Sequence, residues 1–167
     1  ARPGQRRIYS NHGFDVAAKR ADGRAGMPFD EYFHLVWSGT GSRLEGSAGA
    51  GASGTIGDLA ELARELSEPT RLSVETLTEA RAVQFPGLDG VLPGFGRQSP
   101  NDWGLGLELR AGKHPHWTGA RCSPETYGHF GRSGTFLWVD PVAGVALGIL
   151  TDLAFGSWAA EAWPQLS

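Results

Sequence analysis

The stretch YGHFGRSGTFLWVDP, residues 127–141, decides the fold. Its second half, residues 135–140, is a run of apolar, aromatic and β-branched side chains, and residues 145–151 form a second such run. Pro141 and Gly144 lie between the two runs, and both are residue types that favour turns. Two β-rich runs joined by a short turn predict an antiparallel hairpin.

The segments on either side of the hairpin extend the predicted sheet and close it. Residues 103–110 place Trp103 and three leucines at every second position, which is the period of a half-buried strand. Residues 155–163 favour a closing helix that packs Trp158 and Trp163. The second half of the chain therefore predicts a sheet followed by one helix.

The first half of the chain predicts helices. A short one covers residues 13–21, and Pro28 suits the first position of the next. Thr55 can cap a third helix, with Asp58 at the capping-box position, and Ser73 can cap a fourth. Helices followed by an antiparallel sheet predict an α+β architecture.

The composition is that of a soluble globular protein with one domain. The chain has 167 residues, of which 40% are hydrophobic and 20% charged, and its net charge is −3. That charge argues against nucleic acid as a partner, because no basic stripe is available for phosphates. No apolar run approaches the roughly 20 residues that span a membrane, and no signal-peptide pattern opens the chain. The compartment stays open, with the cytoplasm slightly favoured because the single cysteine, Cys122, forms no internal disulfide.

Two other motifs favour ordinary structure over a binding site. GAGASG, residues 49–54, matches the dinucleotide-binding pattern, but no hydrophobic strand precedes it, so we expect a flexible Gly/Ala connector. His114 and His116 in KHPHW have no third ligand at a familiar spacing, so a solvated loop is favoured over a metal site. No G-x-S-x-G nucleophile elbow is present, which disfavours an α/β-hydrolase. We therefore expect no cofactor and no metal.

In the hairpin stretch, His129 and Gly131 are expected at the edge of a strand. A glycine there lets a ligand or another backbone approach closely. An edge strand also offers unpaired N–H groups for a substrate carbonyl or an oxyanion. Taken alone, a buried and hydrogen-bonded histidine is the default interpretation.

Three motifs follow one another along the chain: YSN near the start, a Gly/Ala-rich stretch that leads into a T..DLA.L helix, and the GH.G.SGT hairpin. In this order they resemble the serine β-lactamase and penicillin-binding-protein superfamily, in particular its class C-like branch with esterases and D-amino-acid peptidases. Residues 9–11, Tyr-Ser-Asn, match its Tyr-x-Asn motif. Residues 129–131, His-Phe-Gly, match its third motif, which is usually Lys-Thr-Gly and often His-x-Gly in the esterase-like members.

The resemblance implies a role for each of these residues. Tyr9 would be the general base or proton shuttle, and Asn11 would hold the substrate amide or a neighbouring lysine. Alternate residues of an extended segment project to one side, roughly 6–7 Å apart. A phenol has a pKa of about 10, so nearby cations must lower it before Tyr9 acts as a base near neutral pH. His129 would supply polarity opposite them, and the N–H of Arg132, directly after Gly131, would be an oxyanion donor.

The resemblance also implies that the fold is incomplete in this chain. The family packs an antiparallel sheet against helices beside a helical subdomain, with the site in the cleft between them. Residues 1–88 would belong to the helical subdomain, and residues 89–167 would supply the last strands and the closing helix. The family's nucleophile stands in Ser-x-x-Lys, but neither Lys19 nor Lys113 has a serine three residues before it. We therefore expect the nucleophile on a missing N-terminal part of a longer protein.

The expected function is that of a serine hydrolase that acts by acyl transfer on small-molecule esters, peptides or amides, or β-lactam-type compounds. Phe130 stands where the third motif usually has Thr or Ser, so a substrate carboxylate loses a hydroxyl partner. His129 in place of lysine removes a permanent cation as well. Both changes favour esters over penicillins. The alternatives are a binding or regulatory protein without a nucleophile, and a structural domain in which Tyr-x-Asn is a surface turn.

Overall fold

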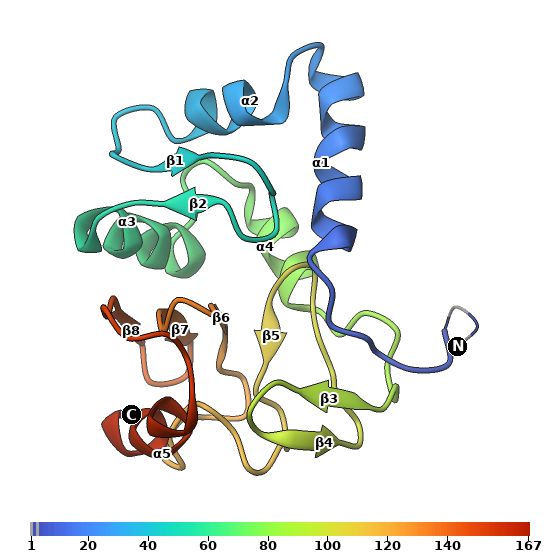
Figure 1. Cartoon of the computed structure of the whole chain (residues 1–167), viewed down its shortest axis with the longest axis vertical. Coiled ribbons are helices and arrows are strands. Elements are labelled where there is room, and N and C mark those ends of the chain that lie inside the picture. The colour runs from blue at the N-terminus through green and yellow to red at the C-terminus, as the bar shows by residue number, and fades with distance from the viewer. Residues whose placement is uncertain (1, 3) are drawn as a thin grey trace. The chain divides into compact units, whose positions relative to one another are not determined.

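The computed structural model describes residue 2 and residues 4–167, and the chain forms two compact units. One unit holds Ala1–Tyr9 and Leu62–Ser167, and the other holds Ser10–Glu61. Figure 1 labels the helices and strands of both. The boundary predicted at residue 88, between a helical subdomain and the strands that follow, is a different division, and it stays a prediction.

The helices predicted in the first half are present, and local caps explain their ends. At the third helix, the Asp58 N–H donates to Thr55 Oγ1 at 3.2 Å and the Thr55 N–H donates to Asp58 Oδ2 at 2.7 Å, which is a capping box. Gly26 ends the first helix with a left-handed φ of 71°. The elements that begin in this unit are α1 (His12–Ala25), α2 (Phe29–Val36), β1 (Arg43–Leu44), β2 (Ala52–Ser53) and α3 (Ile56–Ser67).

The Gly/Ala-rich tract is a tight hairpin. β1 and β2 pair antiparallel, with Leu44 opposite Ala52. A Cβ atom at Gly51 would lie 2.1 Å from the carbonyl oxygen of Glu45, so only glycine fits at that position. The prediction of a flexible connector over residues 49–54 is therefore wrong, because the glycines serve close backbone packing.

The larger unit contains a four-stranded antiparallel sheet in the order β5-β6-β7-β8. A separate two-stranded hairpin, β3-β4, precedes it in the chain. Helices were predicted at Ser73 and near the C-terminus, and both are present. The elements are α4 (Val74–Arg81), β3 (Gly90–Leu92), β4 (Gly96–Gln98), β5 (Glu108–Leu109), β6 (Tyr127–Phe130), β7 (Phe136–Asp140), β8 (Val145–Ile149) and α5 (Ser157–Leu166).

The predicted hairpin is confirmed. β7 and β8 pair antiparallel, with Asp140 opposite Val145 at the closing turn. The Asp140 carboxylate accepts the backbone N–H groups of Val142 and Ala143 at 3.0 and 3.1 Å. An aspartate that accepts its own turn's N–H groups fixes that turn, so the side chain and the DPVAG sequence act together.

The predicted strand over residues 103–110 is largely absent. Only Glu108–Leu109 forms a strand, and Trp103 makes one isolated antiparallel bridge with Glu108. Gly106 has a left-handed φ of 76°, and Leu105 is 56% exposed. The chain therefore folds back on itself between Trp103 and Glu108, a turn that the alternating pattern hides.

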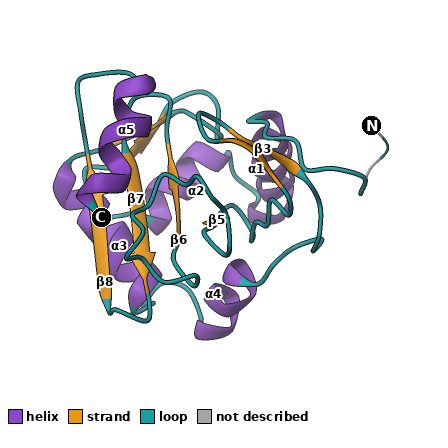
Figure 2. Ribbon diagram, turned by 90° about the horizontal axis from the view of Figure 1, so that it is seen from below, coloured by secondary structure: helices purple, strands orange, loops and turns teal. Residues whose placement is uncertain are grey.

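Aromatic side chains build the core on one face of the sheet. The Trp163 ring of α5 is fully buried, and its centroid lies 4.8 Å from that of Phe136 and 5.6 Å from that of Phe130. Trp117 is buried beside them, 5.7 Å from Phe136. Figure 2 shows α5 alongside β7 and β8. Helices packed against an antiparallel sheet confirm the α+β architecture.

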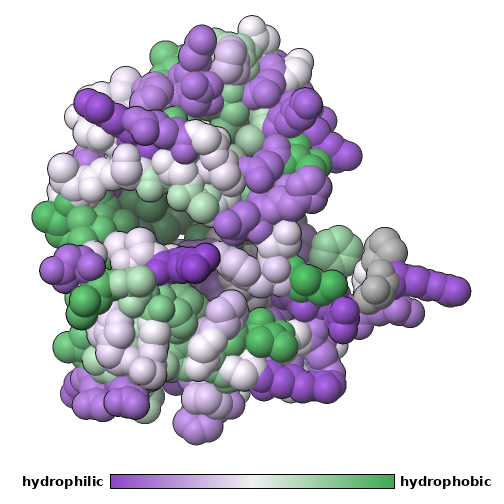
Figure 3. Space-filling model, in the orientation of Figure 1, coloured by the Kyte–Doolittle hydropathy of each residue, from purple (hydrophilic) through white to green (hydrophobic). Residues whose placement is uncertain are grey.

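The opposite face of the sheet contacts the C-terminal end of α3. The buried Tyr127 of β6 donates a hydrogen bond through its hydroxyl to the carbonyl oxygen of Leu66, at 2.5 Å. Elsewhere, hydrophobic residues reach the surface among hydrophilic ones, as Figure 3 shows. Among the helices of the described residues, none has the length and apolarity that crossing a membrane requires.

Candidate active site

The His-Phe-Gly motif begins on β6, whose side chains alternate between the two faces of the sheet. Phe130 points to the face covered by α5, whereas His129 shares the other face with Tyr127. β5 pairs with Tyr127 and Gly128 alone, so β6 extends beyond β5 from His129 onward. The expected edge position is therefore present only at the C-terminal end of β6.

One glycine of β6 is required by packing, and it is Gly128. A Cβ atom there would lie 2.1 Å from the carbonyl oxygen of Leu137 on β7. A Cβ atom at Gly131 would instead meet the hydroxyl oxygens of Thr135 and Ser133, at 3.2 and 3.3 Å. Because those hydroxyls belong to side chains that can rotate, strand packing does not explain Gly131. Its role toward a substrate stays a prediction.

His129 is held by its own strand. Its Nδ1 lies 2.7 Å from the carbonyl oxygen of Phe130, and since a carbonyl only accepts, Nδ1 is the donor. Burial lowers the pKa of His129 below its usual value, although the Phe130 hydrogen bond and the negative charge of Glu108 oppose that shift. The neutral imidazole with its proton on Nδ1 leaves Nε2 as an acceptor.

Tyr9 lies against His129 although the two residues are far apart in the sequence. Their ring centroids are 5.9 Å apart. Trp103 contacts both, with its ring centroid 6.0 Å from that of Tyr9 and 5.4 Å from that of His129. Tyr9 is 43% exposed, so its ring is partly covered and partly open to solvent. Tyr9 and His129 thus meet as the motif order predicts, and Trp103 is a third member that sequence reasoning placed in a strand.

The electrostatics of Tyr9 differ from those of a general base. Burial raises the pKa of the Tyr9 phenol above its usual value, and desolvation is the cause of the shift. The cation that would lower this pKa is therefore not supplied by the described residues of its unit. A catalytic Tyr9 needs that cation from elsewhere.

Asn11 belongs to the other unit and begins α1. Its backbone is helical, with φ −64° and ψ −29°, and its carbonyl accepts the N–H groups of Phe14 and Asp15 at 3.0 and 3.2 Å. The expectation of an extended Tyr-x-Asn segment is therefore wrong at Asn11, because the helix starts there. A role for its side chain toward a substrate stays a prediction.

Arg132 follows the strand in a tight turn. The turn is closed by hydrogen bonds from the Gly131 N–H to Thr135 O at 2.8 Å and from the Gly134 N–H to Gly131 O at 3.0 Å. The Arg132 carbonyl accepts the Phe155 N–H at 2.9 Å, whereas its own N–H donates to no acceptor among the described residues. That N–H is free for an oxyanion, the role predicted for it.

Phe130 packs in the aromatic core. Its ring centroid lies 5.0 Å from that of Phe155, 5.5 Å from that of Trp117 and 5.6 Å from that of Trp163. A ring held on that face of the sheet stabilises the core, so the substrate-binding role of Phe130 stays a prediction.

The KHPHW segment differs most from its prediction. His114 is exposed, as expected of a solvated loop, but His116 and Lys113 are buried. Both bond to the buried carboxylate of Glu108, so the solvated-loop prediction is wrong for His116. The missed signal is Glu108 itself, a carboxylate among alternating apolar residues. No three His, Cys, Asp or Glu side chains gather as a metal site within the described part of the chain.

Comparisons with known proteins support the resemblance to this superfamily. A family model described as Beta-lactamase matches residues 33–166. A crystal structure of a β-lactamase from Mycobacterium bovis aligns with a TM-score of 0.95 and 49% identity, covering 99% of this chain and 64% of that one. A protein from Bacteroides dorei, provisionally named a β-lactamase, shares the fold with a TM-score of 0.69 at 18% identity, covering 89% of this chain and 51% of that one.

A curated relative gives a shorter match. A Salmonella paratyphi B protein, provisionally named a D-alanyl-D-alanine carboxypeptidase, is 40% identical over 65 residues. This match covers 37% of the present chain and 15% of the relative. The chain thus spans less than two thirds of these proteins.

Proposed function

Because the chain belongs to the Beta-lactamase family, we propose that it forms part of a serine hydrolase that works through an acyl-enzyme. Its substrates would be esters, small amides or β-lactam-like compounds. The nucleophilic serine would stand in a Ser-x-x-Lys motif outside these 167 residues. Tyr9, Asn11 and His129 would act from this chain, and Arg132 would contribute its N–H group.

The observation that carries the proposal is the meeting of Tyr9 and His129. Their rings lie 5.9 Å apart, although the residues come from opposite ends of the chain and from the two motifs that the family order predicts. Packing alone does not require a partly exposed tyrosine beside a histidine whose Nε2 is an available acceptor. Reacting groups from distant segments that converge on one place support a site.

In the proposed reaction, the serine oxygen attacks the substrate carbonyl while its proton passes to the Tyr9 phenolate. The bond to the leaving alcohol or amine then breaks, and Tyr9 returns the proton to that group. Water attacks the acyl-enzyme by the same route and releases the acid and the free serine. Since burial raises the pKa of Tyr9, a lysine ammonium of the Ser-x-x-Lys motif would have to lower it.

The groups opposite Tyr9 would stabilise the negative charge of the intermediate. The Arg132 N–H has no acceptor among the described residues and would donate to the oxyanion. His129, neutral because burial lowers its pKa, would act as a polar group without a permanent charge. A site without the lysine ammonium that usually stands at the position of His129 favours neutral esters over carboxylate-bearing β-lactams.

The test uses the full-length protein that carries this chain. It should hydrolyse p-nitrophenyl acetate with a burst equal to one acetyl group per protein, and intact-mass spectra during turnover should show one acetyl adduct. Benzylpenicillin and a D-alanyl-D-alanine peptide, measured in parallel, establish the substrate class. Absence of both burst and adduct with all three substrates would refute the proposal.

A second candidate is a non-catalytic β-lactamase-like binding protein. The observation that favours it is the raised pKa of Tyr9, which no described residue of its unit offsets. Such a protein would bind β-lactams or esters without an adduct and with unchanged ligand. The mass spectra described above therefore separate the two candidates.

A further inference from the structure

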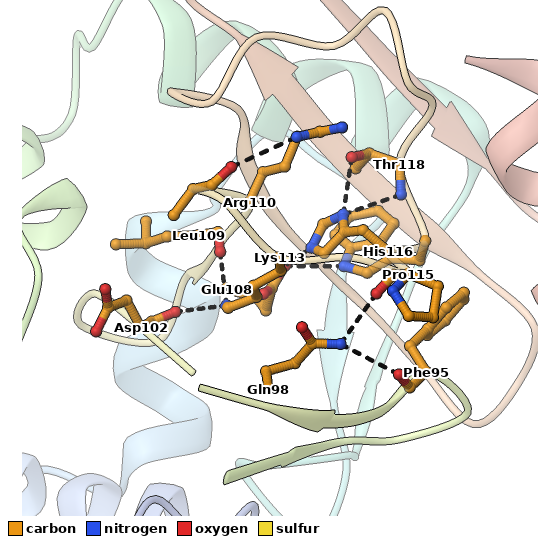
Figure 4. A network of polar contacts seen from close by, with 12 residues as sticks. Phe95, Gln98, Asp102, Glu108, Leu109, Arg110, Lys113, Pro115, His116 and Thr118 are labelled. Atoms are coloured by element: carbon orange, nitrogen blue, oxygen red, sulfur yellow. Dashed lines mark hydrogen bonds and ion pairs between the residues drawn. The ribbon is translucent and has the colours of Figure 1, made fainter. Parts of the chain in front are cut away.

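Lys113 is a buried cation whose hydrogen bonds are all used. Its ammonium donates to the carbonyl oxygens of Asp102 and Leu109, each at 2.6 Å, and to Oε1 of Glu108 (Figure 4). An ammonium has three donors, so these three acceptors saturate it. The acceptors come from both arms of the turn between Trp103 and Glu108. Lys113 therefore clamps that turn closed.

Glu108 completes the same network. Its Oε2 accepts the indole N–H of Trp117 at 2.8 Å and the imidazole Nε2–H of His116 at 2.9 Å. The Nδ1 of His116 accepts the Thr118 N–H at 3.2 Å, which fixes the proton on Nε2. Burial raises the pKa of Glu108, but the hydrogen bond from His116 and the charge of Lys113 outweigh burial and lower it. Glu108 is therefore an ionised, fully bonded carboxylate.

The network reaches the site through Trp103. Lys113 holds the carbonyl of Asp102, the residue before Trp103, and its Nζ lies 6.0 Å from the centre of the Trp103 ring. Trp103 also bridges Glu108 through the backbone. The Trp103 ring also packs edge-on against His129 and tilted against Tyr9. One aromatic ring thus links the buried ion pair to both candidate catalytic groups.

Outside the ion pair, the segment that carries Trp103 is held by two backbone hydrogen bonds, from the Gln84 N–H to Trp103 O at 2.8 Å and from the Leu105 N–H to the Ala80 carbonyl of α4 at 2.9 Å. β5 is two residues long, and the turn contains two glycines, one of which, Gly106, has a left-handed φ. Ala111, two residues before Lys113, has a φ of 47°, which is strained for a residue with a side chain. A short strand with such turns fixes a side chain poorly unless other contacts hold it. The ion pair adds contacts on both arms of the turn, at Asp102 on one arm and at Glu108 and Leu109 on the other.

We propose that Lys113 and Glu108 are positioning residues, which hold Trp103 against Tyr9 and His129 and so set the orientation of these two groups for acyl transfer. This rests on the proposed function of Tyr9 and His129. Neither Lys113 nor Glu108 would touch the substrate, since both are buried. Small displacements of reacting groups reduce rates strongly, by about 10²-fold for roughly 1 Å.

The test compares the full-length protein with a variant that removes both charges, Glu108→Gln/Lys113→Met. Replacing both partners of a buried pair avoids a lone buried charge, so this variant is expected to fold. The matched control is Asp140→Asn, which removes another buried carboxylate, one whose hydrogen bonds among the described residues all go to the Ser123 loop and the β7–β8 turn beside it. Circular dichroism and the melting temperature establish folding for each protein.

Two readouts separate positioning from stability. With p-nitrophenyl acetate, the double variant should lose about 10- to 100-fold in kcat while KM changes less than about threefold. By NMR, the pKa of His129, assigned with His129→Gln, should fall in the double variant because the charge of Glu108 that raises it is gone. Asp140→Asn should change neither readout, even if it lowers the melting temperature more than the double variant does.

The outcomes decide the proposal. A folded double variant with wild-type kcat and an unchanged His129 titration would overturn it, as would equal changes in Asp140→Asn. If the wild-type protein hydrolyses no substrate, the proposed function fails, and the His129 titration still decides whether the network reaches the site. If the double variant does not fold, Glu108→Met/Lys113→Met, whose side chains need no buried partner, is measured in the same way.

Discussion

Two buried carboxylates on the central sheet have opposite kinds of neighbours. Among the described residues, Asp140 at the end of β7 accepts hydrogen bonds only from neutral donors: the N–H and hydroxyl of Ser123 at 2.6 and 2.7 Å, and two N–H groups of its own turn. Glu108, on β5, accepts hydrogen bonds from the Lys113 ammonium, the His116 imidazole and the Trp117 indole. Both side chains are almost fully inaccessible to solvent.

One carboxylate closes a turn, and the other belongs to a network that contacts the candidate catalytic residues. The hydrogen bonds of Asp140 end in the loop and turn beside it, so its effects should be confined to stability. Glu108 instead bonds Lys113, whose ammonium lies 6.0 Å from the centre of the Trp103 ring, and that ring contacts Tyr9 and His129. Substitutions around Glu108 should therefore lower the activity, whereas substitutions around Asp140 should not, even where both lower the stability by similar amounts.

The largest effect is expected at Tyr9, which the network of Glu108 reaches through Trp103. Tyr9→Phe removes only the hydroxyl, so kcat of the full-length protein for an aryl ester should fall by about 10²–10⁴-fold, the usual share of acid–base assistance. The control is Tyr127→Phe, which removes the hydroxyl that bonds Leu66 and should lower stability without lowering kcat. Steady-state kinetics measure both. A loss below about threefold in Tyr9→Phe would make Tyr9 a packing residue.

The next effect concerns the stability of the same network. Glu108→Gln leaves the Lys113 ammonium buried without its counter-charge, and breaking a buried pair in this way costs about 3–5 kcal/mol. Adding Lys113→Met should restore most of that loss, because no charge remains buried. Urea denaturation gives the free energy of unfolding of each protein. Equal values for the single and double variants would show that the pair is not coupled.

Asp140 should show a smaller cost and a distinct pH dependence. Asp140→Asn puts an amide nitrogen among donors and should cost about 1–3 kcal/mol. Although burial alone would raise the pKa of Asp140, its hydrogen bonds outweigh burial and lower it from 3.8 to about 2. Because this pKa is lowered on folding, the carboxylate stabilises the protein above about pH 4, and the contribution is lost as the pH falls toward 2.

Melting temperatures between pH 2 and 7 test that dependence. The wild-type protein should lose stability on acidification faster than Asp140→Asn, so the difference between the two curves should shrink as the pH falls. Parallel curves would mean that Asp140 does not titrate differently in the folded state.

The smallest effect is expected at Ser73, an exposed residue whose side chain accepts a backbone N–H as that of Asp140 does. Ser73 accepts the backbone N–H of Thr76 at 3.1 Å as the N-cap of α4, but it does so in contact with solvent. Ser73→Ala should cost about 1 kcal/mol, the usual value of such a cap. Urea denaturation measures it, with Ser123→Ala as the partly buried comparison, because Ser123 bonds the buried Asp140 through its hydroxyl. A larger cost at Ser73 than at Ser123 would contradict the ranking by burial.

The sequence predicts those parts of the fold that local chemistry determines. Capped helices and the DPVAG hairpin are encoded by residues within a few positions of one another, and both are present. The short strand Glu108–Leu109 depends on β6, a strand far along the chain, where the alternating pattern suggested a longer strand instead. The β1–β2 hairpin depends on the close approach of Gly51 to the Glu45 carbonyl, where the glycine-rich pattern suggested a flexible connector.

The site divides in the same way. Motif order pointed to Tyr9 and His129, whose rings do meet. Trp103 was missed because its place beside them depends on the turn that Lys113 closes. His116 was predicted to be solvated because burial of a polar segment requires a buried partner, and Glu108 lies eight positions earlier, outside local sequence patterns.

We propose that this chain serves a serine nucleophile that stands outside its 167 residues. Labelling with a fluorophosphonate, followed by peptide mapping of the full-length protein, tests it most directly. We expect one stoichiometric adduct on the serine of a Ser-x-x-Lys motif outside residues 1–167, with every serine inside them unmodified. A stable, stoichiometric adduct on a serine within residues 1–167 would contradict it.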